Sequence, residues 1–439
     1  MRPTHTPYGL SRRSLLAGTA GIVAGIGLSA CTADDLIGNR TRVRYWNLFG
    51  GGDGARMTQM TDAFIESRPD IDFRATTLAW GAPYYTKLAM SAAGGRAPEL
   101  AILHLSRLGG YAPGRLLDPF PLDMLAELGI TQDRFLPDIW NRCTVDGELY
   151  AIPLDTHPFV LYYNVDICRE IGLLDSNDQL IPLSGTDELI EAFVEARRVT
   201  GNLGVSLSTG DVSPWRLWWT LYRQLDGELF DESGTELILD EERGLEALEF
   251  MRRLSIEEEV APRGADYQAA VANFSNGQAA FLFNGGWEVT TFQTQQVPFS
   301  MTTFPNVFGN TNRTQGDCHC FVLPHQRNRD WDNTRAALEY VAYMLQNSVD
   351  WAAGGHVPSY LPVVESPEYL NLTPQSHYRH AAENVQLDPD VWFSGSASDM
   401  ESQASGAFGA VHAGTNTPQE ALDQFRGALQ RLLDTPSPV

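Results

Sequence analysis

From residue 43 onward the sequence alternates between segments with the period of a β-strand and segments with the period of an α-helix. VRYWNLF (43–49) alternates like a strand, and residues 57–65 then place apolar side chains at helical spacing. A second strand pattern (71–78) and a second helical pattern (83–93) precede a buried strand at 100–105. Because strands that alternate with helices form mostly parallel sheets, the predicted fold class is α/β.

Three long extended segments interrupt this alternation. They are GELYAIPLDTHPFVLYYNVDI (147–167), residues 298–306 and residues 347–362. Each could cross from one lobe to another, and a chain of this length exceeds what one hydrophobic core usually organises. We therefore predict two discontinuous lobes with a cleft between them: 43–154 plus 305–347 as lobe one, and 155–304 plus 348–439 as lobe two.

The first residues have the layout of an export signal, predicted over residues 1–30. Arg12-Arg13 resembles a twin-arginine signal, and the apolar run that follows is shorter than the roughly 20 residues of a membrane-spanning helix. Leu28-Ser29-Ala30-Cys31 resembles a bacterial lipobox. We therefore expect lipidation of Cys31, a polar tether over 31–42, and anchoring at the outer face of the cytoplasmic membrane.

The chain is acidic, with a formal net charge of −24. Such a surface repels nucleic acid, so no nucleic-acid partner is expected. The charge could serve solubility alone, or it could attract a cationic ligand such as an amino sugar.

Four cysteines remain after Cys31, namely Cys143, Cys168, Cys318 and Cys320. In an exported domain they could form disulfides or lie in the core, and the sequence leaves the pairing open. Cys318-His319-Cys320 lacks the C-x₂₋₄-C spacing and the four ligands of a structural zinc site. We expect neither a metal site nor a cofactor.

The stretch WNLFGGGDGARM contains three consecutive glycines between a strand and a helix. Gly50, Gly52 and Ala55 satisfy the dinucleotide pattern G-x-G-x-x-G/A. However, Asp53 would direct a carboxylate at the pyrophosphate position, and the second strand does not end in the acid that binds ribose. The glycines fit better with a hydroxyl-rich ligand. Asp53 can accept hydrogen bonds from its hydroxyls, and Trp46 or Phe49 can offer it a flat apolar face. Asp53 could equally cap the helix.

Several segments in order resemble the family 1 extracellular solute-binding proteins of ABC importers, the maltose-binding-protein-like group. They are the lipobox, WNLFGGGDGARMTQMTDAFIESRPDI, GELYAIPLDTHPFVLYYNVDI, AAFLFNGGWEV, GGHVPSYLPV and the C-terminal TPQEALDQFRGALQRLL. Gly286 stands where the family often has proline. The resemblance implies a two-lobed periplasmic-binding-protein-like (type II) fold with a hinged inter-lobe cleft. The acidic, arginine-rich lipoprotein also looks like an actinobacterial sugar or amino-sugar binder of the Usp type.

The resemblance also implies a function and partners. The protein would be a monomeric lipoprotein that captures a sugar, oligosaccharide or amino sugar without catalysis. It would deliver the ligand to the transmembrane subunits of an ABC permease, which work with a cytoplasmic ATPase.

Family contacts, carried over residue by residue, give the candidate ligand-binding residues. From lobe one and the first crossing these are Trp46, Asn47, Gly51, Asp53, Trp80, His104, Asp155 and His157. From lobe two and the third crossing they are Trp215, Trp218, Trp219, Asp226, Trp287, Glu288, His356 and Tyr360. At least one tryptophan of the helical cluster Trp215, Trp218 and Trp219 is expected in the core, because these residues border one helix face.

Two other functions remain open on the sequence. A secreted glycoside hydrolase needs two carboxylates across the scissile bond, and Asp53, Asp155, Asp226 and Glu288 could supply them. No G-x-S-x-G or H-E-x-x-H motif is present, and we do not expect an enzyme. A cell-surface carbohydrate-binding lectin is the third possibility.

Overall fold

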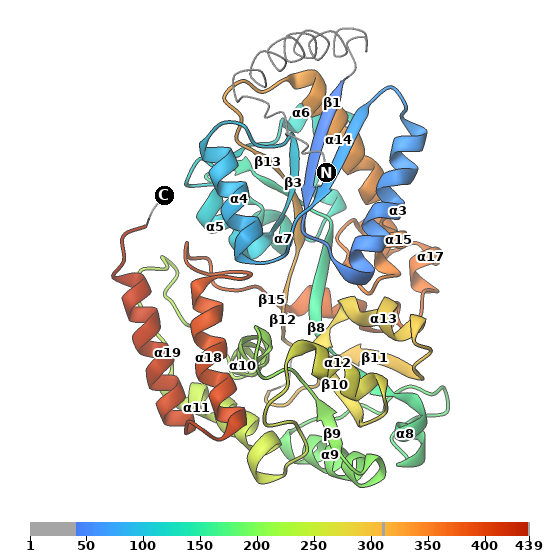
Figure 1. Ribbon diagram of the computed structural model, residues 1–439, viewed down its shortest axis with the longest axis vertical. Helices are drawn as coiled ribbons and strands as arrows, with labels where there is room; N and C mark the ends of the chain where they lie inside the picture. The colour runs from blue at the N-terminus through green and yellow to red at the C-terminus, as the bar shows by residue number, and fades with distance from the viewer. Residues whose placement is uncertain (1–40, 310–311, 438–439) are drawn as a thin grey trace, which may run out of the picture.

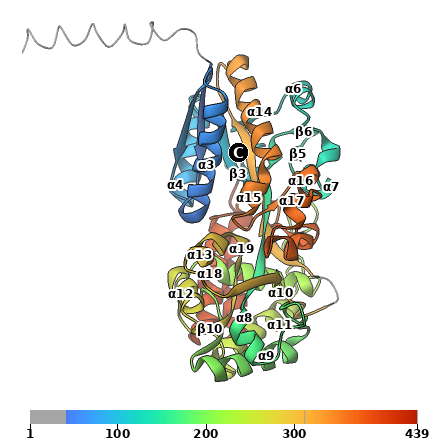
Figure 2. The same cartoon turned by 90° about the vertical axis from the view of Figure 1, so that its right-hand side faces the viewer.

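The computed structural model describes residues 41–309 and 312–437. The predicted export signal (1–30) and the lipidation site Cys31 lie outside these residues. Figures 1 and 2 show two lobes stacked along the long axis, each with its own sheet. Each lobe also has a separate hydrophobic core, so the predicted α/β architecture with two lobes is confirmed.

Lobe one is built on a six-stranded sheet in which β1 pairs in parallel with both β2 and β3, while β13 runs antiparallel to β3. The strands in sheet order are β2 (Asp72–Thr77), β1 (Arg42–Asn47), β3 (Leu100–His104), β13 (His319–Pro324) and β4 (Leu117–Asp118), with β7 (Ala151–Pro153) also paired to β13. The longer helices of this lobe are α3 (Gly51–Ser67), α4 (Ala82–Ala93) and α14 (Trp331–Gln346). Met57, Met60 and Phe64 form the buried stripe of α3 that the helical spacing predicted.

Lobe two is built around β8 (Asp155–Asn164), every residue of which is buried. The sheet order is β15 (Val385–Gln386), β12 (Thr314–Asp317), β8, β10 (Ala279–Gly285) and β9 (Leu203–Ser206), with β11 (Phe299–Thr303) and β14 (Val357–Pro358) also paired to β8. Its longer helices are α9 (Thr186–Thr200), α10 (Ser213–Gln224), α11 (Glu241–Arg252), α12 (Tyr267–Ser275), α18 (Asp399–Ala413) and α19 (Pro418–Leu433).

Shorter elements complete the two lobes and the connections between them. They are α5 (Leu108–Tyr111), α6 (Leu122–Glu127), α7 (Pro137–Arg142), α8 (Val165–Glu170), α13 (Val289–Thr294), α15 (Ser348–Ala352), α16 (Leu361–Val364), α17 (Pro367–Leu370) and the two-stranded pair β5 (Thr144–Val145) and β6 (Glu148–Leu149).

The three connections between the lobes lie side by side. β12 and β14 both pair with β8, through Asp317↔His157 and Val357↔Thr156. At the same level, the Leu154 amide donates to the His319 carbonyl at 2.8 Å. The residues around positions 154, 318 and 357 therefore form one narrow ribbon between the two cores.

The second crossing differs from the sequence expectation. Residues 298–306 contain β11, which pairs with β8 inside lobe two, and the chain returns to lobe one only after Asp317. Trp351, assigned from sequence to lobe two, packs in the core of lobe one. An extended pattern reveals a strand but not its pairing partner, so the boundaries at 305 and 348 could not be placed from sequence.

All four cysteines that follow Cys31 are buried free thiols. Of the two possibilities that the sequence left open, they therefore lie in the core and do not form disulfides. Within the described residues, none of the helices has both the length and the apolar character needed to cross a bilayer.

Candidate ligand-binding cleft

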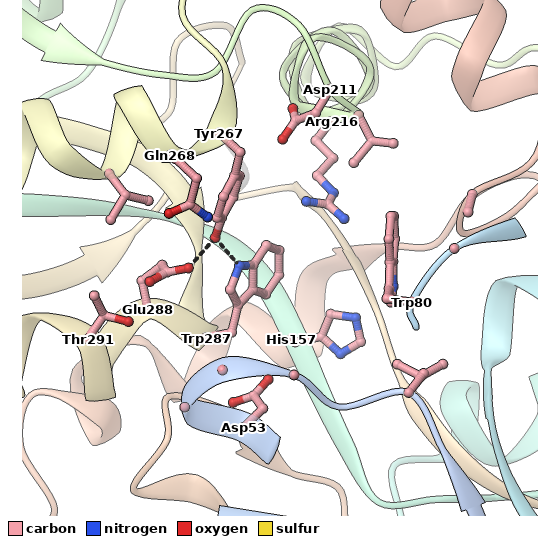
Figure 3. Close-up of a pocket in the computed structure, with 18 of the residues that line it drawn as sticks. Asp53, Trp80, His157, Asp211, Arg216, Tyr267, Gln268, Trp287, Glu288 and Thr291 are labelled. Atoms are coloured by element: carbon pink, nitrogen blue, oxygen red, sulfur yellow. Dashed lines mark hydrogen bonds between the residues drawn. The ribbon is translucent and has the colours of Figure 1, made fainter. Parts of the chain in front are cut away.

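A cleft with a volume of about 1460 Å³ opens between the lobes. Lobe one contributes the loop after β1, the start of α3 and the Trp80 turn. Lobe two contributes α12, the segment after β10, Arg216 of α10 and the first half of α18. Figure 3 shows these side chains converging from opposite walls.

The lobe-two wall centres on Trp287. Its indole nitrogen donates to the Tyr267 hydroxyl at 2.7 Å, and that hydroxyl donates in turn to the Glu288 carboxylate (Figure 3). The Arg216 guanidinium lies 4.8 Å from the centre of the Trp287 ring. Burial, followed by the Glu288 charge, holds the pKa of Tyr267 well above its usual range, so Tyr267 stays a neutral donor. These contacts fix the indole plane.

The glycines beside Trp287 have a packing reason. A Cβ on Gly286 would collide with the backbone carbonyl of Gly355, which belongs to the third crossing. The family departure at Gly286 therefore permits close backbone approach, and Trp287 keeps its place on the cleft.

The lobe-one wall is formed by the glycine-rich loop. Gly51 has φ +56°, a left-handed conformation that glycine adopts without strain. α3 begins there with Gly50 as its N-cap and without a side-chain cap, so Asp53 is not the helix cap that the sequence left open. Asp53 instead directs one carboxylate oxygen towards His356, at 3.1 Å. Trp80 stands 44% exposed on the same wall, where a ring face is free to stack.

Histidines form the floor of the cleft. His104, His157 and His319 all line it, and the His157 and His319 rings stack with their centroids 4.2 Å apart. Burial is the main cause that lowers the pKa of His157 to about 3 and that of His104 well below its usual value. These two histidines are therefore neutral at physiological pH.

Beneath the floor lies one fully buried carboxylate, Asp155. Its oxygens lie 3.0 Å from His157 Nδ1 and 2.8 Å from His319 Nδ1. Trp351 Nε1 also donates to it, at 2.6 Å. Burial opposes the charge on Asp155, but the neighbouring His319 and His356 outweigh it and lower its pKa well below the usual value. For His356, burial is likewise outweighed by Asp53 and Asp155, which raise its pKa.

The structure brings part of the predicted set together. The predicted residues that line the cleft are Gly51, Asp53, Trp80, His104, His157, Trp287 and Glu288. Asp155 and His356 lie directly behind this lining, with no exposed surface.

The expectation for the α10 tryptophans is corrected. Trp215, Trp218 and Trp219 belong to the core of lobe two, with at most 3% of their surface exposed. Each indole N–H has an internal acceptor, and Trp215 for example donates to Asp388 at 3.1 Å. The helix turns its aromatic face inward, because burying such large apolar surfaces stabilises the lobe more than exposing them.

The remaining candidates also lie away from the cleft lining. Trp46 packs half-buried under the Lys87 ammonium, and the Asn47 side chain accepts from the amide of Phe49 at 3.2 Å. Asp226 sits in a turn and pairs with Arg313. Tyr360 packs on Phe135 in lobe one.

The sequence did not predict several of the polar lining residues, among them Arg216, Tyr267 and His319. His319 had a signal, because Cys318 and Cys320 pack in the core and strand alternation turns the residue between them to the other side. Arg216 is the lone charge within SPWRLWW, a weak sign that one helix face is open. Tyr267 opens α12 and carried no signal.

Two α/β lobes around a ligand-sized cleft define a two-lobed binding protein of the periplasmic type. The model of the bacterial extracellular solute-binding protein family matches residues 51–347, and the chain belongs to this family.

Among named relatives, the arabinooligosaccharide-binding protein of Halalkalibacterium halodurans is 27% identical over 265 residues, covering 59% of this chain and 56% of the relative. The maltodextrin-binding protein MdxE of Bacillus subtilis is 23% identical over 50% of each chain. This chain thus spans about half the length of these relatives.

Two solved structures share the fold. The GacH receptor of Streptomyces glaucescens superposes with a TM-score of 0.75 at 18% identity, covering 90% of this chain and 99% of that one. Maltose-bound MalE3 of T. maritima gives a TM-score of 0.75 at 18% identity, covering 89% and 99%. At this identity the likeness shows the fold alone.

Proposed function

We propose that the protein captures a carbohydrate in the inter-lobe cleft and delivers it to the permease of an ABC importer. The observation that carries the proposal is the pairing of aromatic faces and polar groups across the cleft (Figure 3). Trp80 and Trp287 offer rings on opposite walls, and Asp53 and Glu288 offer carboxylates nearby. Sugars have both apolar CH faces and a rim of hydroxyls, so they suit such a lining.

The names of the relatives point to the ligand size. Proteins described as binding arabinooligosaccharides and maltodextrins are similar to this chain, and the cleft volume of about 1460 Å³ accommodates more than a monosaccharide. We therefore infer a short oligosaccharide as the ligand. We expect micromolar affinity for this ligand, which corresponds to a binding free energy of about −8 kcal/mol.

Capture without chemistry is the function that the residues support. Glu288 accepts a hydrogen bond from the Tyr267 hydroxyl, and Asp53 faces His356, so both carboxylates already have protein partners. A ligand that touches both lobes favours the conformation in which both are in reach, and a permease can recognise that conformation. The predicted export signal and lipid on Cys31 would keep the receptor at the outer face of the cytoplasmic membrane.

A melting-temperature screen with malto-, arabino- and chito-oligosaccharides tests the proposal. We expect at least one series to raise the melting temperature while the saccharide remains intact by chromatography. Released reducing ends would instead indicate a glycoside hydrolase. No shift with any saccharide would contradict carbohydrate capture, and binding restricted to polymer ends would favour a surface lectin.

A further inference from the structure

The cluster beneath the cleft floor has a composition that sugar binding does not explain. One oxygen or ring nitrogen from each of Asp155, His157, His319 and His356 lies within 4.8 Å of all the others. All four side chains are buried, with at most 7% of their surface exposed. Three imidazoles around one carboxylate form a donor set that divalent transition metals prefer.

The three imidazoles are grouped around the Asp155 carboxylate. The Nδ1 atoms of His157, His319 and His356 lie 3.0, 2.8 and 3.3 Å from the Asp155 oxygens. Ligand atoms in a tetrahedral zinc site lie about 3.4 Å apart when each is about 2.1 Å from the metal. The cluster therefore needs only small side-chain shifts to surround an ion.

His356 is the second, independent observation. Its side chain has no exposed surface. Its Nε2 lies 3.1 Å from Asp53 and its Nδ1 3.3 Å from Asp155, yet neither ring nitrogen forms a hydrogen bond. An unsatisfied polar atom in a protein interior is costly, so such groups normally have a partner. A metal ion at the cluster would be bound by His356 Nδ1 and would supply that partner.

The surroundings also suit a metal site. Trp351 Nε1 and the His319 amide both donate to Asp155, at 2.6 and 3.0 Å, and so hold this carboxylate in position. Such outer contacts orient the ligands of metal centres. His157 and His319 line the cleft, which gives an ion a path to the cluster.

We propose that Asp155, His157, His319 and His356 bind one divalent transition-metal ion of the zinc class. The four ligands come from all three connections between the lobes: β8 carries Asp155 and His157, β13 begins at His319, and His356 immediately precedes β14. The ion ties the three strands together where they pass between the lobes. It also forms part of the cleft floor, beside the bound saccharide.

Zinc and cobalt titrations of the full chain, purified without a polyhistidine tag and treated with chelator, test the site. We expect about one equivalent of either metal per chain and a visible cobalt absorption typical of four-coordinate nitrogen and oxygen ligation. At about a hundredfold excess of zinc over its dissociation constant, the melting temperature should rise by roughly 5 °C, and chelator should reverse the rise.

Two ligand variants and one control assign the site. His319→Gln and His356→Gln should each reduce zinc affinity at least tenfold and remove the cobalt absorption. His412→Gln is matched for burial but lies in α18 of lobe two, and it should retain both. Near-ultraviolet circular dichroism establishes that each variant is folded.

Two outcomes would overturn the site. Wild-type protein that binds less than stoichiometric metal at micromolar zinc excludes it, and this measurement does not depend on any variant folding. Metal binding that persists in a folded variant carrying both His319→Gln and His356→Gln excludes these ligands. Neither outcome depends on the saccharide screen.

Discussion

Trp287 and Trp215 are both tryptophans, but one lies at the cleft and the other in the core of lobe two. Trp287 is half-buried on the cleft wall, whereas Trp215 has no exposed surface. The sequence identified Trp287 through the glycines beside it, which open the backbone. It could not sort the α10 tryptophans, because helical spacing shows which residues share a face but not whether that face meets a core or a cleft.

Trp287→Ala should weaken saccharide binding by about 2 kcal/mol, or about thirtyfold, because it removes a fixed ring face from the cleft. Calorimetric titration of the best ligand from the screen measures the change. Trp331→Ala is the control, because Trp331 is 53% exposed on α14, outside the cleft lining. Equal affinities for both variants would show that Trp287 does not stack on the ligand.

The buried His412 should make the free energy of unfolding depend on pH. It is fully buried in α18 with its Nδ1 2.7 Å from the Ser255 hydroxyl, and burial lowers its pKa to about 4. The unfolded chain takes up a proton near pH 6.5 and the folded chain only near pH 4, so folding loses stability as pH falls through this window. Between these two pH values, His412 should lower the free energy of unfolding by about 1.4 kcal/mol for each unit that the pH falls.

Urea unfolding of wild type and His412→Gln at pH 7 and pH 5 measures this contribution. The wild type should lose about 2 kcal/mol more than the variant between the two pH values, since the comparison cancels the other titrating groups. Equal losses would mean that His412 is protonated in the folded state at pH 5.

At the scale of elements, helices were predicted well where the helical period continued over several turns. The helical pattern predicted at 83–93 is α4 (Ala82–Ala93), and the apolar spacing over 57–65 falls within α3 (Gly51–Ser67). The extended segment 298–306 was misplaced, because a short strand can pair with a sheet in either lobe. Its partner, β8, is set by contacts far away in the sequence.

The two faces of α10 have different roles: one packs in the core of lobe two, and the other meets the cleft. Its tryptophans fill the core of lobe two, while Arg216 lies over Trp287 at the cleft. Trp218→Ala should lower the free energy of unfolding by about 3–5 kcal/mol, because it leaves a cavity where a fully buried ring was packed. Urea unfolding tests this. A loss below about 1 kcal/mol, within the range of surface substitutions, would contradict the core assignment.

The whole molecule was predictable as two lobes because the alternation of strand and helix and the extended crossings are encoded along the chain. The cluster beneath the cleft floor was not, since Asp155, His319 and His356 meet only when the three crossings lie side by side. Asp155, His157 and His356 were each predicted as ligand-binding candidates, but the sequence did not place them together. Sites assembled from distant segments depend on tertiary structure, and one sequence carries no record of their proximity.

The lobes approach each other closely at one edge of the cleft, where a Cβ on Gly52 of α3 would lie 3.0 Å from Thr290 Cβ of α13. Paired cysteines need Cβ atoms about 3.8 Å apart, so Gly52→Cys with Thr290→Cys can form a disulfide after a small shift. If a saccharide enters and leaves by movement of the lobes, this bond should slow its exchange at least tenfold, and reductant should restore the rate. Stopped-flow tryptophan fluorescence measures the exchange, with each single-cysteine variant as control.

Because the native thiols at 143, 168, 318 and 320 are buried, oxidation should join only the introduced pair within the described residues. Equal exchange rates in the oxidised and reduced forms would show that the saccharide passes through the cleft without parting the lobes.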